Sequence, residues 1–234
     1  MFPVAHKQRK LYKIESLENP RIVWELEVDK SRGHVFVDSE AGIVWVSDGA
    51  GKLTLLRVED KGGTFEKKVI SGLVSGKLLR PQWVRTDSIG NVYVLDAARA
   101  SIVKTDPDGK TFREIVKNVG TYNSCGYFCL DREDNLYVTE SPSSRNAFRL
   151  RKVDSEGRPL KIGGEDFLSF DGDRDWNLGG TFGRVKGVCV DRTGDIYVTG
   201  TINSYAPQFR GCRFSPKNVR LTAQDKELHQ YNAL

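Results

Sequence analysis

Several residue types that mark particular protein classes are scarce in this sequence. Its 234 residues include three histidines, four cysteines and one methionine. No apolar run approaches the roughly 18 residues that a membrane-spanning helix needs. The first ten residues hold no apolar segment followed by a cleavage pattern, so no signal peptide is visible. We therefore predict no membrane insertion, while the cellular compartment stays open.

The scarcity of histidine and cysteine also limits the chemistry that the chain can carry. His6 and His229 lie near the two ends, and His34 lies at the edge of an expected strand. No histidine trio for a metal and no credible histidine base can be formed from these positions. No C-x-x-C motif or zinc-like cluster is present, and we expect the cysteines to be small buried apolar residues. We accordingly expect no catalytic residues and no cofactor.

Charge is close to balanced, with 36 basic and 31 acidic residues and a net charge of +5. The composition is 38% hydrophobic and 29% charged, as in a folded globular protein. A mildly basic chain can favour an acidic partner such as nucleic acid, but there is no dense basic run.

What the sequence does contain is one hairpin pattern that recurs four times. Each copy has an alternating strand ending in Asp, a tight polar turn, and a second alternating strand with an aromatic residue. The Asp positions are 38, 87, 131 and 191, with spacings of 49, 44 and 60 residues. A period of about 40 to 50 residues is typical of β-propeller blades.

The turns and the aromatic residues have fixed places in this hairpin. The turn pairs are Gly42-Ile43, Gly90-Asn91, Asp134-Asn135 and Gly194-Asp195. They favour positive φ and predict type I′ turns. The aromatic residues Trp45, Tyr93, Tyr137 and Tyr197 share one register, which predicts a core between blades rather than a ligand platform.

Two further strands follow each hairpin, and the turn between them places Gly or Asn where a left-handed conformation is needed. The sequence thus predicts an all-β fold, a β-propeller of four-stranded antiparallel blades in one domain, with four full blades and an N-terminal half blade. The domain covers residues 9–222, with the half blade at 9–28, blades at about 34–71, 82–117, 126–163 and 186–222, and tails at 1–8 and 223–234.

The half blade lacks the inner hairpin that begins the other blades, and residues 223–234 contain no copy of it. An apolar blade face without a neighbour is avoided by soluble proteins. We therefore expect a partial propeller, completed either by the remaining blades of a parent chain or by a second copy.

These motifs resemble the NHL-repeat family and the wider superfamily of six-bladed propellers. The closest stretch is Arg80 to Asp96 followed by Ile102 to Gly109, with its Asp, Gly-Asn turn, aromatic-Val pair and Asp-x-x-Gly turn. Gly200 and the long loop after Gly163 depart from the pattern. The resemblance implies that the loops between second and third strands share one ligand-binding face with the connections between blades.

That face is expected to carry the candidate binding residues Asp48, Asp96, Arg99, Glu140, Arg145, Trp176, Asn203 and Tyr205. Asp48, Asp96 and Glu140 occupy equivalent places in three blades. They form either a ring of carboxylates for a cation or basic peptide, or caps for the backbone amides of their own loops. Because an acidic residue recurs at the same place in three blades, the capping interpretation is favoured.

The long connection after Gly163 contains Asp171, Asp173 and Asp175, which match the first three ligands of a calcium loop. Trp176 and Phe182 break the rest of that pattern. A polar surface loop outside the blades is the alternative to a calcium site, and Trp176 would then suit a lid.

We expect the chain to be a non-catalytic binding scaffold for a protein or peptide. One alternative is a metal-dependent propeller hydrolase or lyase, lactonase-like, whose site is incomplete in this segment. A further alternative is single-stranded RNA bound by a basic face that includes Arg85, Arg145, Arg149 and Arg151. Lys104 and Lys152 are expected to be solvated.

Replacing Tyr137 by Ala should lower the free energy of unfolding by about 3 to 5 kcal/mol, because a large core aromatic is lost. Denaturant unfolding of the two proteins measures this difference. A nearly neutral substitution would mean that the strand register is wrong.

Overall fold

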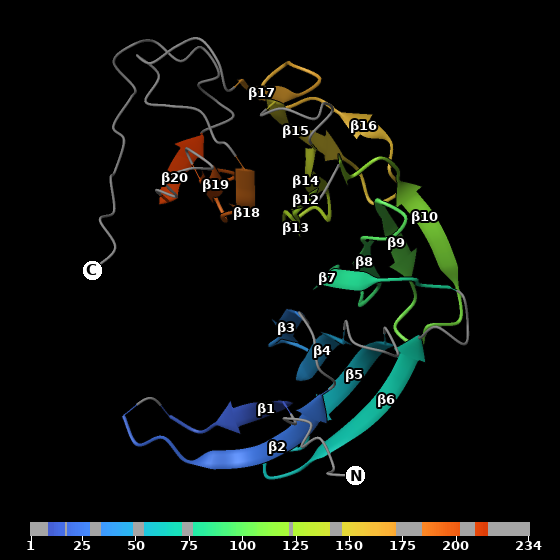
Figure 1. Ribbon diagram of the computed structural model, residues 1–234, viewed down its shortest axis with the longest axis vertical. Helices are drawn as coiled ribbons and strands as arrows, with labels where there is room; N and C mark the ends of the chain where they lie inside the picture. Colours follow the sequence, from blue (N-terminus) through green and yellow to red (C-terminus); the bar gives the residue numbers. More distant parts are fainter. Residues whose placement is uncertain are drawn as a thin grey trace, which may run out of the picture. The chain divides into compact units, whose positions relative to one another are not determined.

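The computed structural model describes residues 9–16, 18–28, 34–48, 54–71, 77–121, 124–140, 147–171, 184–201 and 209–214. Every regular element in these ranges is a β-strand (Figure 1). Among the described residues, no helix has the length and apolar character that crossing a membrane requires. The chain divides into two compact units. The first consists of Met1–Arg99 and Val103–Arg113, and the second of Ala100–Ile102 and Glu114–Leu234.

The first unit begins with a two-stranded antiparallel sheet, the half blade, formed by β1 (Arg9–Ile14) and β2 (Ile22–Val28). The first blade is a four-stranded antiparallel sheet of β3 (His34–Asp38), β4 (Ile43–Asp48), β5 (Thr54–Asp60) and β6 (Phe65–Ser71). The strands pair in chain order, as the sequence predicts for a blade.

The second blade has the same order, with β7 (Pro81–Thr86), β8 (Val92–Asp96), β9 (Ser101–Thr105) and β10 (Phe112–Val116). The division between the two units runs through β9 and β10. A short hairpin of β11 (Gly120–Thr121) and β12 (Ser124–Cys125) follows, which the sequence did not predict.

The third blade contains β13 (Phe128–Leu130), β14 (Leu136–Glu140), β15 (Ala147–Val153), β16 (Pro159–Leu160) and β17 (Leu168–Asp171). The described strands of the fourth blade are β18 (Arg184–Val190), β19 (Ile196–Thr201) and β20 (Phe209–Phe214). Its predicted outer strand at residues 219–222 lies outside the described residues.

The outer strand of the third blade is built from two pieces. β16 pairs with the end of β15 (Leu160 opposite Lys152), and β17 pairs with its beginning (Asp171 opposite Ala147). Our expectation that the connection after Gly163 lies outside the blades is therefore wrong for its first part. β16 is too short to pair the whole of β15, and β17 supplies partners for the remaining backbone groups.

The hairpin turns are not of type I′. Only the first residue of each pair has positive φ in the later hairpins, as at Gly90 (86°), Asp134 (60°) and Gly194 (88°). The amide of Gly90 donates to the carbonyl of Asp87 at 3.1 Å, and the amide of Asp87 donates to Asn91 at 3.0 Å. This is a three-residue loop, a type I turn followed by a left-handed bulge residue. The predicted hairpins are present, but the turn type was wrong.

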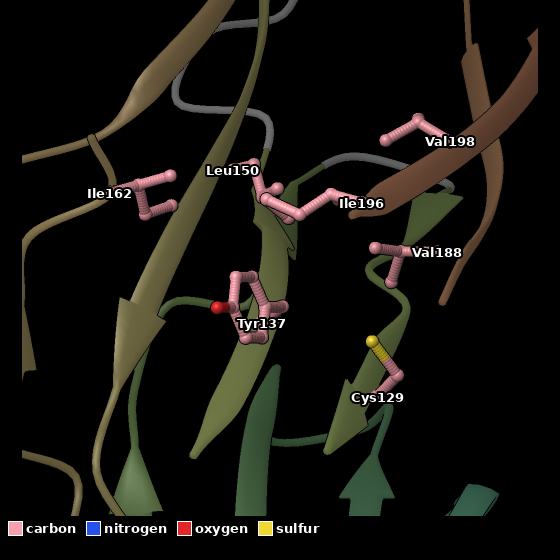
Figure 2. Packing of buried hydrophobic residues seen from close by; sticks show 7 residues of the cluster. All are labelled: Cys129, Tyr137, Leu150, Ile162, Val188, Ile196 and Val198. Carbon is pink, nitrogen blue, oxygen red and sulfur yellow. The ribbon is translucent and has the colours of Figure 1, made fainter. Parts of the chain in front are cut away.

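The faces of neighbouring blades pack against each other. In the first unit, Trp45 and Leu55 of the first blade lie in one cluster with Val84 and Val94 of the second. In the second unit, a matching cluster joins the third and fourth blades, and Figure 2 shows its members Cys129, Tyr137, Leu150, Ile162, Val188, Ile196 and Val198. Sheets that stack in this way remove the inner-facing side chains from water.

The predicted aromatic core is confirmed in three blades, since Trp45, Tyr93 and Tyr137 are buried, whereas Tyr197 is half-buried. Cys129 is buried, as expected, but Cys189, at the same register in the fourth blade, is exposed. The expectation that the cysteines are buried was therefore wrong for Cys189.

In the second and third blades, the turn between the third and fourth strands requires glycine for two reasons. Gly109 and Gly157 have φ of 69° and 85°, which confirms the predicted left-handed conformation. A Cβ at Gly157 would also overlap the backbone carbonyl oxygen of Ile115 on β10, and one at Gly109 would overlap the side chain of Ile70 on β6. Each turn therefore lies directly against an outer strand.

Replacing Gly157 by Ala should lower the free energy of unfolding by about 2 to 4 kcal/mol, because steric overlap with a backbone atom adds to the strain of positive φ. Gly62 is the matched control, with φ of 82° and no atom within 4 Å of a Cβ. Gly62→Ala should cost only about 1 kcal/mol. Equal losses in denaturant unfolding would contradict the close approach to β10.

Candidate functional site

The recurring Asp residues close their own hairpin turns. Asp87 Oδ1 accepts hydrogen bonds from the amides of Ile89 (3.2 Å) and Asn91 (2.7 Å). Asp131 and Asp191 accept equivalent pairs of amide bonds in the third and fourth blades. These carboxylates stabilise the turns through hydrogen bonds from nearby backbone amides, as in Asx turns.

A half-buried basic residue completes this group in the second and third blades. Lys104 Nζ lies 3.7 Å from Asp87 and 5.2 Å from the ring centre of Tyr93, and its side chain is 15% exposed. Lys152 Nζ lies 3.0 Å from Asp131, and its side chain is 17% exposed. The prediction that both lysines are solvated was therefore wrong. Each is held by a carboxylate and an aromatic ring of its own blade.

The surroundings of Tyr137 and Lys152 in the third blade shift the pKa values of both side chains. Burial raises the pKa of Tyr137. Burial alone would lower the pKa of Lys152, but hydrogen bonds to Tyr137 and Asp131 outweigh it and raise that pKa. Lys152 thus stays charged at neutral pH, which keeps its ion pair intact.

Asp96, a predicted ligand-face residue, is fully buried and acts as a cap. It accepts hydrogen bonds from the amides of Leu79 (2.8 Å), Arg80 (3.0 Å) and Ala98 (3.1 Å). The capping interpretation is correct for this residue, and the bonds also tie the end of β8 to the segment before β7. Arg99 lies beside it, at 3.4 Å from Asp96 and 2.5 Å from the carbonyl oxygen of Lys77.

Glu140 is the centre of an ion-pair group that the sequence analysis did not predict. It is 4% exposed and pairs with Arg149 Nε at 2.8 Å and Arg151 Nη2 at 2.5 Å. β15 places Arg149 opposite Glu140 and Arg151 opposite Val138, so both guanidinium groups reach the same carboxylate. The amides that Glu140 was predicted to cap belong to residues 141–146, which lie outside the described residues, so the capping interpretation stays a prediction for this residue. The guanidinium of Arg149 also lies 5.1 Å from the Phe167 ring centre.

The other predicted site residues are outside what the structure describes. Only the backbone is described for Asp48 and Asp171, which end β4 and β17. Arg145, Trp176, Asn203, Tyr205, Asp173 and Asp175 are outside the described residues. In the described part of the chain, no three His, Cys, Asp or Glu side chains gather as a metal site would require. The calcium site stays a prediction.

The structure brings together a group that the sequence analysis missed, the β3–β7 cluster of His34, Phe36, Trp83 and Arg85. The guanidinium carbon of Arg85 lies 4.8 Å from the ring centres of both Phe36 and Trp83. The His34 ring meets the Trp83 ring edge-on, with centres 4.6 Å apart. All four side chains are half-buried.

Ser47 positions the two strands that carry this cluster. Its hydroxyl accepts from the amide of His34 (3.0 Å) and donates to the carbonyl oxygen of Gln82 (2.7 Å), so one buried side chain joins β3, β4 and β7. A sequence signal existed: His34 and Trp83 both lie four residues before the repeated Asp, and Phe36 and Arg85 two residues before it. Comparing repeats position by position would have paired them.

His34 is affected electrostatically by this environment. Burial lowers the pKa of His34, and the positive charge of Arg85 lowers it further. The imidazole is therefore neutral at neutral pH, and the net charge of the cluster comes from Arg85.

No protein-family model matches the chain, and no sequence among curated proteins matches it. Similar folds occur among solved structures. A chain from a nidogen–laminin complex matches with a TM-score of 0.54 and 14% identity, over 88% of this chain and 70% of that one. A protein of unknown function from Bacteroides caccae matches with a TM-score of 0.52 and 12% identity, over 82% and 67%. A streptogramin B lyase structure has 11% identity over 76% and 52%, and its TM-score of 0.46 is too low to support an argument.

At these identities the likeness shows the fold alone. Together with the repeated four-stranded sheets, it confirms the predicted fold class: the chain is an all-β protein of the β-propeller type, with four-stranded antiparallel blades.

The pKa of His34 should lie below its ordinary value of 6.5, and Arg85→Gln should raise it part of the way back. A lowered histidine pKa means that the unfolded state binds the proton more readily. The stability that His34 contributes is thus complete above pH 6.5 and is lost as the pH falls through the lower folded value. NMR titration in a protein with His6→Gln and His229→Gln isolates this ring. Titration at or above 6.5 would contradict the described burial.

Proposed function

We propose that this chain is a binding scaffold that holds an acidic segment of a protein or peptide at the β3–β7 cluster. The observation that carries the proposal is the guanidinium of Arg85, held at 4.8 Å from the ring centres of both Phe36 and Trp83. Tryptophan and arginine dominate the energetics of protein interfaces, and here they lie in contact before any ligand arrives.

Rigidity supports this choice of site. The cluster stands on paired strands rather than on loops, and Ser47 joins β3, β4 and β7 through one hydroxyl group. A ligand that meets side chains already in place loses less of its binding free energy to ordering them.

The charge around β7 supports an acidic ligand. Arg80 and Arg99 are exposed near the start of this strand, and Arg85 lies further along it. Asp96 is fully buried, accepts hydrogen bonds from backbone amides and lies 3.4 Å from Arg99. These three arginines and one carboxylate carry a net positive charge, which attracts carboxylate side chains.

The NHL-type family and a six-bladed ring are part of the same proposal. They are supported by the repeated Asp, aromatic and basic residues of Asp87, Tyr93 and Lys104, which form one group in the blade closest to the family pattern. The remaining blades would come from a parent chain or a second copy. The nidogen–laminin structure indicates only that a chain of this fold can belong to a complex between proteins.

A protein or peptide is favoured over single-stranded RNA by the fate of the basic residues. Arg149 and Arg151 share Glu140, while Lys104 and Lys152 pair with Asp87 and Asp131. These four side chains are used inside the fold, whereas a nucleic-acid groove needs basic groups that reach phosphates.

Selection from a displayed peptide library tests the proposal. The intact chain should enrich peptides rich in Asp and Glu, and Trp83→Ala with Arg85→Gln should weaken their binding about 30-fold, as for the loss of an interface hot spot. Arg132→Gln removes one exposed charge from the hairpin turn of the third blade, in the other unit, and is the matched control, with binding expected to stay unchanged.

Thermal unfolding of each variant shows whether it remains folded. The proposal fails if the selected peptides bind the double variant as tightly as the intact chain. It also fails if single-stranded RNA binds with a steep salt dependence while no peptide is enriched.

A further inference from the structure

One position in the repeated inner strand is buried in three blades and exposed in the first. Three residues before the recurring Asp stand Val84, Phe128 and Val188, which are 1%, 0% and 5% exposed. Val35 holds the same position on β3 and is 48% exposed. Val35 is therefore exposed to water at a position that is buried in the other three blades.

The neighbours of the buried valines show what covers this position. Val84 shares a cluster with Trp45 and Leu55 of the preceding blade, and Val188 shares one with Tyr137 and Leu150. The cover is thus an aromatic residue from a second strand and a leucine from a third strand.

The half blade supplies one of these two residues. Leu11 on β1 stands two residues before a basic residue, as Leu55 and Leu150 do on β5 and β15, so the three leucines hold equivalent positions. Leu11 packs against the cluster that contains Val46 and Leu56. Val46 and Leu56 are accordingly 3% and 6% exposed. β1 and β2 correspond to third and fourth strands, so the half blade has no second-strand aromatic to place over β3. Val37, on the same face as Val35, is 58% exposed.

The sheet edge next to these valines is open as well. In the complete blades the third strand pairs with a second strand on one side and a fourth strand on the other. Among the described residues, β1 pairs with β2 alone, which leaves the backbone groups of its other edge available to a further strand.

Lys13 indicates which side chains such a strand would carry. It corresponds to Arg57 and Lys152, which stand opposite Trp45 and Tyr137 in the register of their own sheets. In the half blade Lys13 instead lies 2.5 Å from Asp60. A strand added to β1 in the register of the other blades would thus place an aromatic residue opposite Lys13.

We propose that a β-hairpin from a polypeptide segment outside these 234 residues docks here. One of its strands pairs antiparallel with β1, its aromatic side chain covers Val35 and Val37, and its turn carboxylate approaches Lys13. This is β-strand addition, in which backbone hydrogen bonds supply affinity and side chains supply specificity. A second folded copy would not supply this hairpin, because its hairpins of this pattern are each built into a sheet: β3–β4, β7–β8, β13–β14 and β18–β19.

A synthetic peptide copying residues 80–97, which holds one complete hairpin of this pattern, is the probe. Labelled peptide should bind the intact chain saturably, and Tyr93→Ser within the peptide should weaken binding at least tenfold. Val35→Lys with Val37→Lys in the protein should have the same effect. Val69→Lys is the matched control, since Val69 is 57% exposed on the outer strand β6.

Hydrogen exchange separates strand addition from adhesion to an apolar surface. The bound peptide should slow exchange at the amides of β1, and the lysine variants should remain folded because both valines are already exposed. Binding that is absent, that survives the lysine variants, or that leaves β1 unprotected overturns the proposal. Self-association of the chain that the lysine variants abolish and the peptide does not compete would make a second copy the occupant, and would also overturn it.

Discussion

The structure depends on apolar packing between the faces of successive sheets. A four-stranded sheet carries branched and aromatic side chains on both faces, so each blade needs a neighbour on either side to bury them. Trp45 and Leu55 meet Val84 and Val94 in this way in the first unit. In the second unit, Tyr137 and Leu150 meet Val188 and Val198. The exposure of Val35 follows from the same requirement, because β1 and β2 cover only the outer part of the first blade.

The recurring polar residues make hydrogen bonds and ion pairs within their own blades, and so support this packing. Asp87 closes its turn and holds Lys104 against Tyr93, while Glu140 neutralises two arginines that would otherwise be partly buried without a counter-charge. A recurring charged residue is therefore a poor guide to a binding site in this fold. Positions where the repeats differ are more informative, and the β3–β7 cluster is one of them, since His34 and Trp83 share a register and differ in chemistry.

Local patterns predicted the elements better than their details. The recurring Asp and the turn residue of each hairpin (Gly, or Asp134 in the third), with alternating apolar residues on either side, were sufficient to predict the hairpins. Whether Gly90 opens a two-residue turn or closes a three-residue one depends on the pairing of Asp87 with Asn91, which the residue types alone leave open. β17 is a similar case: its pairing with β15 is decided by how much of that strand β16 leaves without a partner.

The sequence by itself determined the all-β class, the repeated four-stranded unit and the aromatic core of the first three blades, because these follow from alternation and turn residues within about 40 neighbouring positions. Only the tertiary structure decided the fate of individual charged and aromatic side chains. It paired the half-buried Lys104 and Lys152 with carboxylates of their own blades, gathered two arginines around Glu140, and joined Phe36 to Arg85 across two blades. Such contacts join residues as much as 49 positions apart, where distance in space depends on the packing of whole sheets.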